Sequence, residues 1–216
     1  MISGSNHDES RLFVAFQYDL AGNPLTDAGY PSAVADFFHQ PVSSQLVQAA
    51  LNEYPLSNYP PPEGYSVSAP LALGALESDI VFVCTARNAD LLLSPYTLTY
   101  TYEFNDETAP PFLPSAELSF PQGDSHFIEL EYLFDLSAFG ITPAFNSAQQ
   151  QLSDTMIGYW TQFAKTGSPN FEGAPHWPAY TGSDGQFESL VAPNPTIESD
   201  ASFDTDHKCS SFWNTF

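Results

Sequence analysis

The chain has 216 residues, of which 43% are hydrophobic and 15% aromatic, enough to build one large globular domain or two small ones. Its 4 Lys and Arg residues against 26 Asp and Glu residues give a formal net charge of −22. Phosphate backbones and anionic membrane surfaces repel such a chain, which excludes nucleic acid as an expected partner. We interpret the acidity as a solvated surface that keeps the protein soluble.

The sequence indicates neither a membrane span nor an export signal. No uninterrupted apolar run reaches the roughly 20 residues that a helix needs to cross a bilayer. Residues Met1–Asp8 lack the basic and hydrophobic regions of a signal peptide. We therefore expect the chain as written to carry no leader and no anchor.

The first half predicts helices more clearly than strands. Met1–Asn6 is expected to hold the last two residues of a strand before a loop. Helical spacing predicts a helix over Ser32–Phe38, capped by Ser32, and another over Ser44–Tyr54. The long apolar pattern from Leu71 to Leu93 predicts a buried helix.

The clearest strand is Tyr96–Phe104, where apolar and aromatic residues alternate with threonines. We expect it to lie at an open sheet edge with an uncovered apolar face. Ser147 and Gln150 predict a capping box for a helix that ends at Gly167. The apolar stripe of that helix is interpreted as core packing rather than as a cofactor site; it consists of Leu152, Met156, Tyr159, Trp160 and Phe163.

A final strand is predicted around Phe187–Val191. The order of the elements, with helices around one clear strand, favours the end of an α/β domain. Cys84 and Cys209 allow one disulfide, worth on the order of 4 to 5 kcal/mol in the chain-entropy model. Two buried free thiols are the alternative, and composition leaves the two evenly balanced.

The stretch Gly123–Phe134 places His126 on a loop just before a short, carboxylate-rich helix. A loop imidazole can act as a general base, although most histidines in folded domains are structural or solvated. A catalytic imidazole also needs a carboxylate on its other nitrogen. Glu9, in a polar turn after the first strand, is the candidate; the alternative is that Asp8 and Glu9 cap a helix starting near Arg11.

Other chemistry finds little support in the sequence. No Gly-x-Ser-x-Gly turn, which exposes the nucleophile of α/β-hydrolases, occurs in the chain, and no Gly-rich phosphate loop occurs either. The histidines at 7, 39, 126, 176 and 207 form no pair at helical spacing, and no Cys-x-x-Cys is present. We therefore expect no metal and no cofactor.

Several segments, in order, resemble those of the type-B carboxylesterases, a branch of the α/β-hydrolases. The resemblance covers essentially the whole chain and points to the C-terminal part of that family. The matching segments are Gly4–Glu9, Gly123–Phe134, Leu152–Asn170, Trp177–Tyr180 and Cys209–Trp213. Leu152–Asn170 matches the family pattern nearly residue for residue.

The resemblance implies that residues 1–216 are the C-terminal portion of one carboxylesterase domain with an α/β-hydrolase fold. Glu9 falls on the acid and His126 on the base of the family's Ser-Glu-His triad. Glu129 falls on a buried carboxylate near the site, although by position alone it is equally a first-turn helix carboxylate. Cys84 and Cys209 fall on positions that form a disulfide in some members, which implies export of the intact protein to the periplasm or the exterior.

Two residues depart from the family pattern. Ser10 follows the acid and Phe127 follows the histidine, where the family usually has Gly at both positions. The half of the family domain with the nucleophile elbow has no counterpart in this chain. The resemblance therefore implies a segment that is inactive alone, acting on a small-molecule ester only together with an N-terminal half. The alternatives are a non-catalytic, cholinesterase-like binding or adhesion module and a non-functional remnant.

Overall fold

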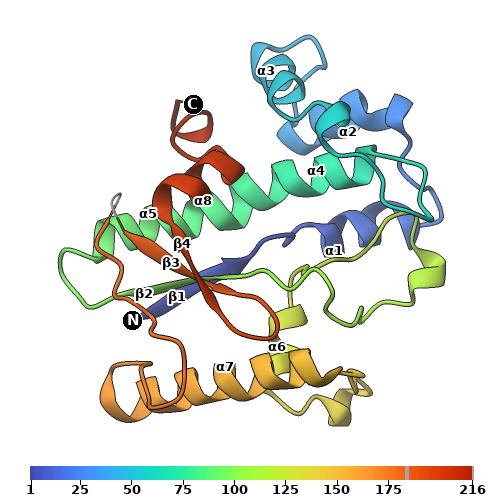
Figure 1. The fold of residues 1–216 in the computed structure, drawn as a ribbon. Coiled ribbons are helices and arrows are strands. Elements are labelled where there is room, and N and C mark those ends of the chain that lie inside the picture. Colours follow the sequence, from blue (N-terminus) through green and yellow to red (C-terminus); the bar gives the residue numbers. More distant parts are fainter. Residues whose placement is uncertain (183–184, 216) are drawn as a thin grey trace.

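The computed structural model describes residues 1–182 and 185–215, and its centre is a four-stranded mixed sheet in the order β1-β2-β3-β4. The strands are β1 (Ile2–Asn6), β2 (Tyr100–Phe104), β3 (Gln186–Leu190) and β4 (Thr196–Ser199). The first three are parallel and β4 is antiparallel to β3. Helices cover both faces of the sheet, which confirms the α/β class (Figure 1).

One helical layer contains α6 and α7, and the opposite layer contains α4, α5 and α8 (Figure 1). Further short segments are π-helical at Ala15–Asp19 and Asp79–Val83, and 3₁₀-helical at Asp27–Gly29, Leu56–Asn58, Ser115–Glu117, Ser137–Phe139 and Trp213–Thr215. The α-helices are α1 (Arg11–Val14), α2 (Tyr30–Phe38), α3 (Gln45–Glu53), α4 (Ala69–Ser78), α5 (Cys84–Leu93), α6 (Ile128–Leu133), α7 (Ser147–Thr166) and α8 (Asp200–His207).

Strand β1 has 5 residues, more than the two that the sequence predicted for this stretch. It pairs with β2 along its whole length, from Ile2 opposite Tyr100 to Asn6 opposite Phe104. Gly4 permits this approach, because a Cβ there would lie 2.3 Å from the carbonyl oxygen of Tyr102. The sequence of β1 is poor in strand-forming residues, so its neighbour, and not its own propensity, makes it a strand.

Strand β2 is central, so the prediction that it forms an open edge is wrong. It pairs with β1 on one side and β3 on the other. It is also shorter than predicted, because Tyr96 and Leu98 precede it and are 87% and 65% exposed. Thr101 and Glu103 are buried on one face and Tyr100 and Phe104 on the other, which shows that both faces of the strand are covered. Among the described strands, β1 forms the open parallel edge.

The predicted helix from Leu71 to Leu93 is present as α4 and α5, joined by the π-helical turn Asp79–Val83. Contrary to the sequence prediction, the combined helix Ala69–Leu93 is long and apolar enough to cross a membrane. However, 67% of its most apolar stretch is buried inside the protein. It is therefore a core helix of this fold.

The helix ends differ in detail from the predictions. Helix α2 begins at Tyr30 after Gly29, so Ser32 is not its cap. The capping box of α7 is formed by Asn146 and Gln149, one residue earlier than predicted. Each side chain bonds the backbone of the other residue, which satisfies free amides at the helix start.

Two predicted helix ends are confirmed. Ser44 caps α3 by accepting a hydrogen bond from the backbone nitrogen of Val47. Gly167 ends α7 in a left-handed conformation, with φ of 79°. The apolar stripe of α7 is core, because Leu152, Met156 and Tyr159 are fully buried against the sheet and neighbouring aromatic residues.

Cys84 and Cys209 form a disulfide, which decides between the two states that the composition left open. The bond joins the start of α5 to the segment after α8 and spans 125 residues of sequence. Because α5 belongs to the core helix and Cys209 to the C-terminal segment, the bond fixes the end of the chain on the fold.

Removing this disulfide is expected to lower the free energy of unfolding by about 4 to 5 kcal/mol, because the unfolded chain regains the freedom of a long loop. Urea denaturation of the Cys84→Ala, Cys209→Ala double variant measures this loss. Wild-type protein with and without reductant is the companion comparison. A loss below about 1 kcal/mol would contradict the prediction.

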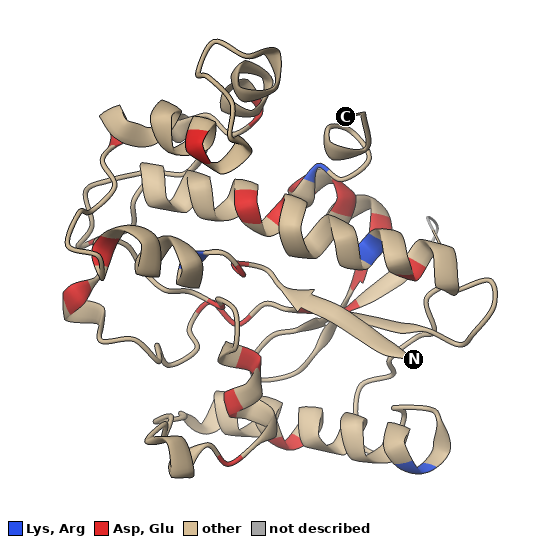
Figure 2. Ribbon diagram, turned by 180° about the vertical axis from the view of Figure 1, so that it is seen from behind, with Lys and Arg blue, Asp and Glu red and all other residues tan. Residues whose placement is uncertain are grey.

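Many carboxylates are buried, so a purely solvated acidic surface is an incomplete interpretation of the net charge. Figure 2 shows Asp and Glu residues spread over both helical layers rather than gathered in one patch. Some have cationic partners: Arg87 donates hydrogen bonds of 2.9 and 2.6 Å to the carboxylate of Asp200. The buried acidic residues are Asp8, Glu9, Asp19, Glu77, Asp79, Asp90, Glu103, Asp106, Asp124, Glu131, Glu188 and Asp200.

Glu188 is one of several incompletely compensated positions among them. It is fully buried on β3, and one carboxyl oxygen accepts a 3.2 Å hydrogen bond from the Tyr159 hydroxyl. The other oxygen has no hydrogen-bond partner among the described residues. Burial raises the pKa of Glu188 to about 8. Between the ordinary pKa of a glutamate and about 8, the folded state therefore holds a proton that the unfolded state has released. The free energy of unfolding falls as the pH rises through this range.

We expect Glu188→Gln to stabilise the protein at pH 7 to 8, because the amide keeps the Tyr159 hydrogen bond and has no proton to lose. Between pH 5 and 7, loss of this proton should lower the unfolding free energy of the wild type by up to about 1.4 kcal/mol per pH unit. The variant should lack this contribution to the decline. Urea denaturation across this range provides the measurement, with exposed Glu172→Gln as the matched control. Equal slopes of unfolding free energy against pH for wild type and Glu188→Gln would disprove this prediction.

Candidate functional site

The structure brings Glu9 and His126 together beyond the carboxyl ends of β1 and β2. Glu9 lies in the turn between β1 and α1, and His126 in the turn before α6. The Glu9 Oε2 atom lies 2.6 Å from Nδ1 of His126. The His126 backbone nitrogen also donates to the Glu9 carbonyl oxygen at 3.1 Å. Two segments separated by more than a hundred residues are thus joined by both side chain and backbone.

Asn6, the last residue of β1, fixes this arrangement, although it was not among the predicted site residues. Its backbone nitrogen donates to Glu9 Oε1 at 2.9 Å. Its side-chain amide donates to the Ser125 carbonyl at 2.9 Å and to Glu129 Oε2 at 2.6 Å. Asn6 therefore contacts the Glu9 carboxylate, the residue before His126, and Glu129. Its position at a strand end before the acidic turn was the available sequence signal.

Glu9 does not cap the first helix, which was the alternative explanation for this carboxylate. Helix α1 has Ser10 at its N-cap position and no side-chain capping bond. Asp8 instead forms an ion pair of 2.7 Å with Arg11. Both Glu9 carboxylate oxygens are directed to Asn6 and His126, as the hydrogen bonds above show.

The electrostatics favour a charged imidazole next to Glu9. The hydrogen bond that His126 donates to Glu9 raises the pKa of His126 above its ordinary value, against the opposing effect of partial burial. The nearby Glu129 charge adds a smaller increase, and burial raises the pKa of Glu129 itself. The His126 side chain is 45% exposed, whereas the Glu9 side chain is only 8% exposed. The pair thus presents an imidazole to its surroundings and keeps the carboxylate behind it.

Two aromatic side chains flank the His126 ring. The ring centroids of Phe13 and Phe82 each lie 5.3 Å from that of His126. The two phenyl rings stack on each other at 5.7 Å with an interplanar angle of 8°. Phe13 belongs to α1 and Phe82 to the π-helical turn of the core helix, so the site has an apolar wall from two elements.

The two departures from the family pattern have different structural consequences. Phe127 has φ of 84° and ψ of −21°, a left-handed conformation that favours Gly and is costly for a bulky residue. Its ring packs 5.8 Å from that of Phe112, which supports it there. Ser10 has φ of −80° in the ordinary helical region, so this position requires no Gly.

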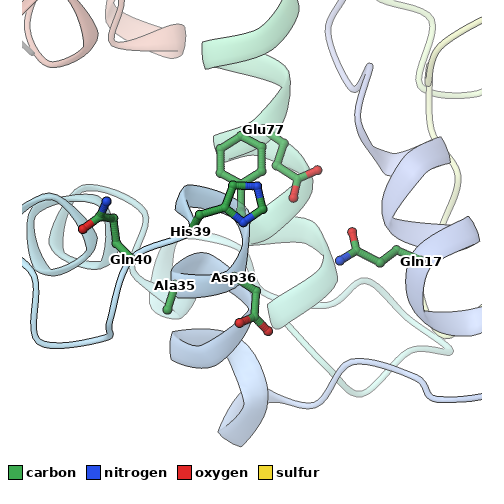
Figure 3. Close-up of a pocket in the computed structure, with 7 residues that line it drawn as sticks. Gln17, Ala35, Asp36, His39, Gln40 and Glu77 are labelled. Atoms are coloured by element: carbon green, nitrogen blue, oxygen red, sulfur yellow. The ribbon is translucent and has the colours of Figure 1, made fainter.

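A separate depression of about 630 Å³ lies between α2, the core helix and the π-helical turn after α1 (Figure 3). Its labelled side chains include Asp36, His39 and Glu77. Burial raises the pKa of Glu77 to about 7. Neither Glu9 nor His126 lines this depression, so it is distinct from the carboxylate–imidazole pair.

A mixed sheet with a carboxylate and an imidazole paired beyond its strand ends is the arrangement of acid and base in α/β-hydrolases. Comparison with known protein families identifies the family to which the chain belongs. The model of the Carboxylesterase family matches residues 1–209, and the chain belongs to that family.

Curated relatives agree with this assignment. A bile salt-activated lipase from Rattus norvegicus is 26% identical over 199 residues, covering 86% of this chain and 30% of the relative. A cocaine esterase from Homo sapiens is 33% identical over 103 residues, covering 48% of this chain and 18% of the relative. An acylcarnitine hydrolase from Rattus norvegicus is 32% identical over 100 residues, covering 46% of this chain and 17% of the relative. The chain thus matches less than a third of the length of each of these relatives.

The Glu9–His126 contact makes a direct prediction for the titration of the imidazole. Replacing Glu9 by Gln removes the hydrogen-bonded charge, so the His126 pKa should fall. Glu129→Gln should lower it by less, because that charge is a smaller cause of the shift. Titration of the imidazole resonances by NMR measures both changes.

Glu172→Gln, an exposed carboxylate elsewhere, serves as the control. An unchanged His126 pKa in Glu9→Gln would show that the hydrogen bond is not formed in solution. Because the folded pKa is raised, the stabilisation from this pair is present below the ordinary histidine pKa. It is lost as the pH rises through the folded value.

Proposed function

We propose that this chain is the C-terminal portion of a serine carboxylic-ester hydrolase and supplies the acid and base of a Ser-Glu-His triad. The observation that carries the proposal is the 2.6 Å contact between Glu9 and Nδ1 of a partly exposed His126. In this arrangement Nδ1–H donates to Glu9, which fixes the tautomer and leaves Nε2 as the proton acceptor. Nε2 takes the proton from the serine hydroxyl and returns it to the leaving alcohol.

Glu9 has an electrostatic role in this mechanism. As His126 accepts the proton it becomes a cation, and the adjacent carboxylate stabilises that charge without taking the proton itself. Asn6 holds the carboxylate through its backbone nitrogen, so little reorganisation is needed during the reaction. Glu129 supports the site through Asn6 rather than through contact with the imidazole. Asn6 and Glu129 are therefore positioning residues.

The serine nucleophile and the oxyanion donors are proposed to come from an N-terminal half. Two structural features support this. The outer edge of β1 is unpaired among the described strands, so another parallel strand can add there. Phe13, Phe16 and Val81 are 38%, 50% and 46% exposed, an apolar surface suited to a protein partner. The limited coverage of the longer relatives agrees with such a division.

The alternative is a non-catalytic binding or adhesion module, or a remnant without function. The exposed apolar side chains suit a binding module as well as a missing half. A binding module, however, has no need for a carboxylate hydrogen-bonded to an imidazole and fixed by a third residue. The Asn6–Glu9–His126 geometry therefore favours the hydrolase.

The substrate is proposed to be a small carboxylic ester, and the reaction needs no cofactor. Similarity to a bile salt-activated lipase and a cocaine esterase supports an ester substrate. Phe13 and Phe82 would give an apolar group of the substrate a wall next to the base. The Cys84–Cys209 disulfide favours an oxidising compartment, so we propose that the intact protein is secreted or periplasmic.

Residues 1–216 alone are expected to hydrolyse p-nitrophenyl acetate no faster than the His126→Ala variant, because no serine hydroxyl among the described residues is hydrogen-bonded to the His126 imidazole. Fusing the chain behind the N-terminal part of a family member that contains Gly-x-Ser-x-Gly should create activity. In that fusion His126→Ala should reduce kcat by at least about 10³-fold, whereas Glu172→Gln should leave it unchanged. Its kcat/KM should rise as the pH passes through the His126 pKa, because only neutral imidazole accepts the proton.

Two outcomes would overturn the proposal. One is ester turnover by residues 1–216 that is abolished by His126→Ala, because the nucleophile would then lie in this chain. The other is an active fusion whose kcat is unaffected by His126→Ala, because the imidazole would then have no catalytic role.

A further inference from the structure

A second group of titratable side chains lies beside the Glu9 loop and takes no part in the proposed reaction. His7 follows β1, Glu103 lies on β2, and His207 is the last residue of α8. One potential ligand atom from each residue lies within 4.8 Å of those of the other two. Their positions in the sequence are far apart, so only the fold makes them neighbours. This explains why spacing rules indicated no metal site.

Each histidine of this group has an aspartate at Nδ1. His207 Nδ1 lies 2.6 Å from Asp79 Oδ1, and His7 Nδ1 lies 3.3 Å from Asp8 Oδ1. Asp79 is itself held by a 2.6 Å hydrogen bond from the Tyr54 hydroxyl. Metal-binding histidines characteristically donate one ring N–H to a carboxylate, which orients the ring and strengthens the other nitrogen as a ligand.

The remaining ring nitrogens and Glu103 form the core of the group. Nε2 of His207 lies 2.6 Å from Oε1 of Glu103. The rings of His7 and His207 meet edge to face, with centroids 5.1 Å apart. Two imidazoles and one carboxylate make a donor set that suits Zn²⁺ and other first-row transition metals better than Ca²⁺ or Mg²⁺.

The group is accessible from one side. The His7 side chain is 35% exposed, whereas those of Glu103 and His207 are 2% and 4% exposed. A cavity of about 200 Å³ adjoins the group and is lined by His7, Asp79 and His207 together with Tyr59, Ala75 and Asp206. An ion can therefore enter past His7, and the cavity offers room for a water ligand in an open coordination position.

We propose that His7, Glu103 and His207 bind a first-row divalent transition-metal ion of the Zn²⁺ class, with Asp8 and Asp79 orienting the two imidazoles. The 2.6 Å separation of His207 Nε2 and Glu103 Oε1 is too short for both atoms to coordinate one ion at about 2.0 to 2.2 Å. Binding therefore separates these two side chains, and the proton between them leaves to solvent as the ion takes its place.

A neighbouring group, formed by His7, Asp8 and Asp124, also has ligand atoms within 4.8 Å of one another. It is the weaker candidate, because the Arg11 guanidinium lies 2.7 Å from Asp8 and repels a cation. Among the described residues, the ion pairs of Glu103 and His207 involve no Lys or Arg. The observations therefore favour the site on Glu103.

Metal binding would connect three distant parts of the chain. The ion would join the loop after β1, the central strand β2 and the end of α8. Glu9 lies only two residues after His7 in the same loop, so the ion would stabilise the loop that holds the acid without touching ester or base. The proposal does not depend on esterase activity and is tested without it.

The test is calorimetric titration of Zn²⁺ into the chelator-treated full chain at pH 7.5 in 150 mM NaCl. We expect one saturable equivalent. His7→Asn, at a partly exposed position where folding should be preserved, should weaken binding at least about tenfold. Glu103→Gln should do the same, and His176→Asn, in the loop after α7, should bind like wild type. Circular dichroism verifies that each variant is folded.

Cobalt(II) gives an independent measurement, because its visible absorption becomes intense when it has four ligands including imidazole. We expect this absorption in wild type and His176→Asn, and its loss in His7→Asn. Absence of a stoichiometric equivalent, or binding unchanged by His7→Asn in a folded variant, would overturn the proposal. Weak binding by many surface carboxylates, without a distinct equivalent, would also overturn it.

Discussion

The parallel pairing of β1 with β2 is the constraint on which the rest of the structure depends. It places Asn6 opposite Phe104 at the carboxyl end of both strands. The turn after β1 then carries Glu9 to His126, which returns from the long segment that follows β2. The same pairing brings His7 next to Glu103, so one sheet contact assembles both the proposed triad pair and the proposed metal site.

The long core helix complements this arrangement from the opposite side. Its π-helical turn Asp79–Val83 supplies Phe82 to the His126 ring and Asp79 to the His207 ring. An uninterrupted α-helix would rotate these positions relative to one another, so the π turn determines which histidine each of the two side chains contacts. The disulfide at Cys84, immediately after the turn, fixes the C-terminal segment that follows His207. Both groups of residues are thus held by the same few backbone elements.

Local sequence signals predicted some elements well and others poorly. The helix containing Leu71–Leu93 and the apolar stripe of α7 were correct, because long periodic patterns report burial directly. Strand β1 was underestimated, since Ile-Ser-Gly-Ser-Asn has weak strand propensity and forms only beside β2. The expected edge at β2 was wrong, because β1 and β3 come from the two ends of the chain and cover both of its sides. Family resemblance, and not periodicity, identified Glu9 and His126.

By itself, the sequence determined the α/β class, the carboxylesterase family and the residues proposed for the acid and base, because these depend on local patterns and recognisable motifs. Only the tertiary structure decided that the cysteines are bonded, that Asn6 fixes Glu9, and that His7, Glu103 and His207 lie together. It also decided that Phe127 occupies a left-handed conformation. The physical reason is that these features depend on contacts between residues far apart in the chain, or on backbone geometry imposed by such contacts, which no local pattern encodes.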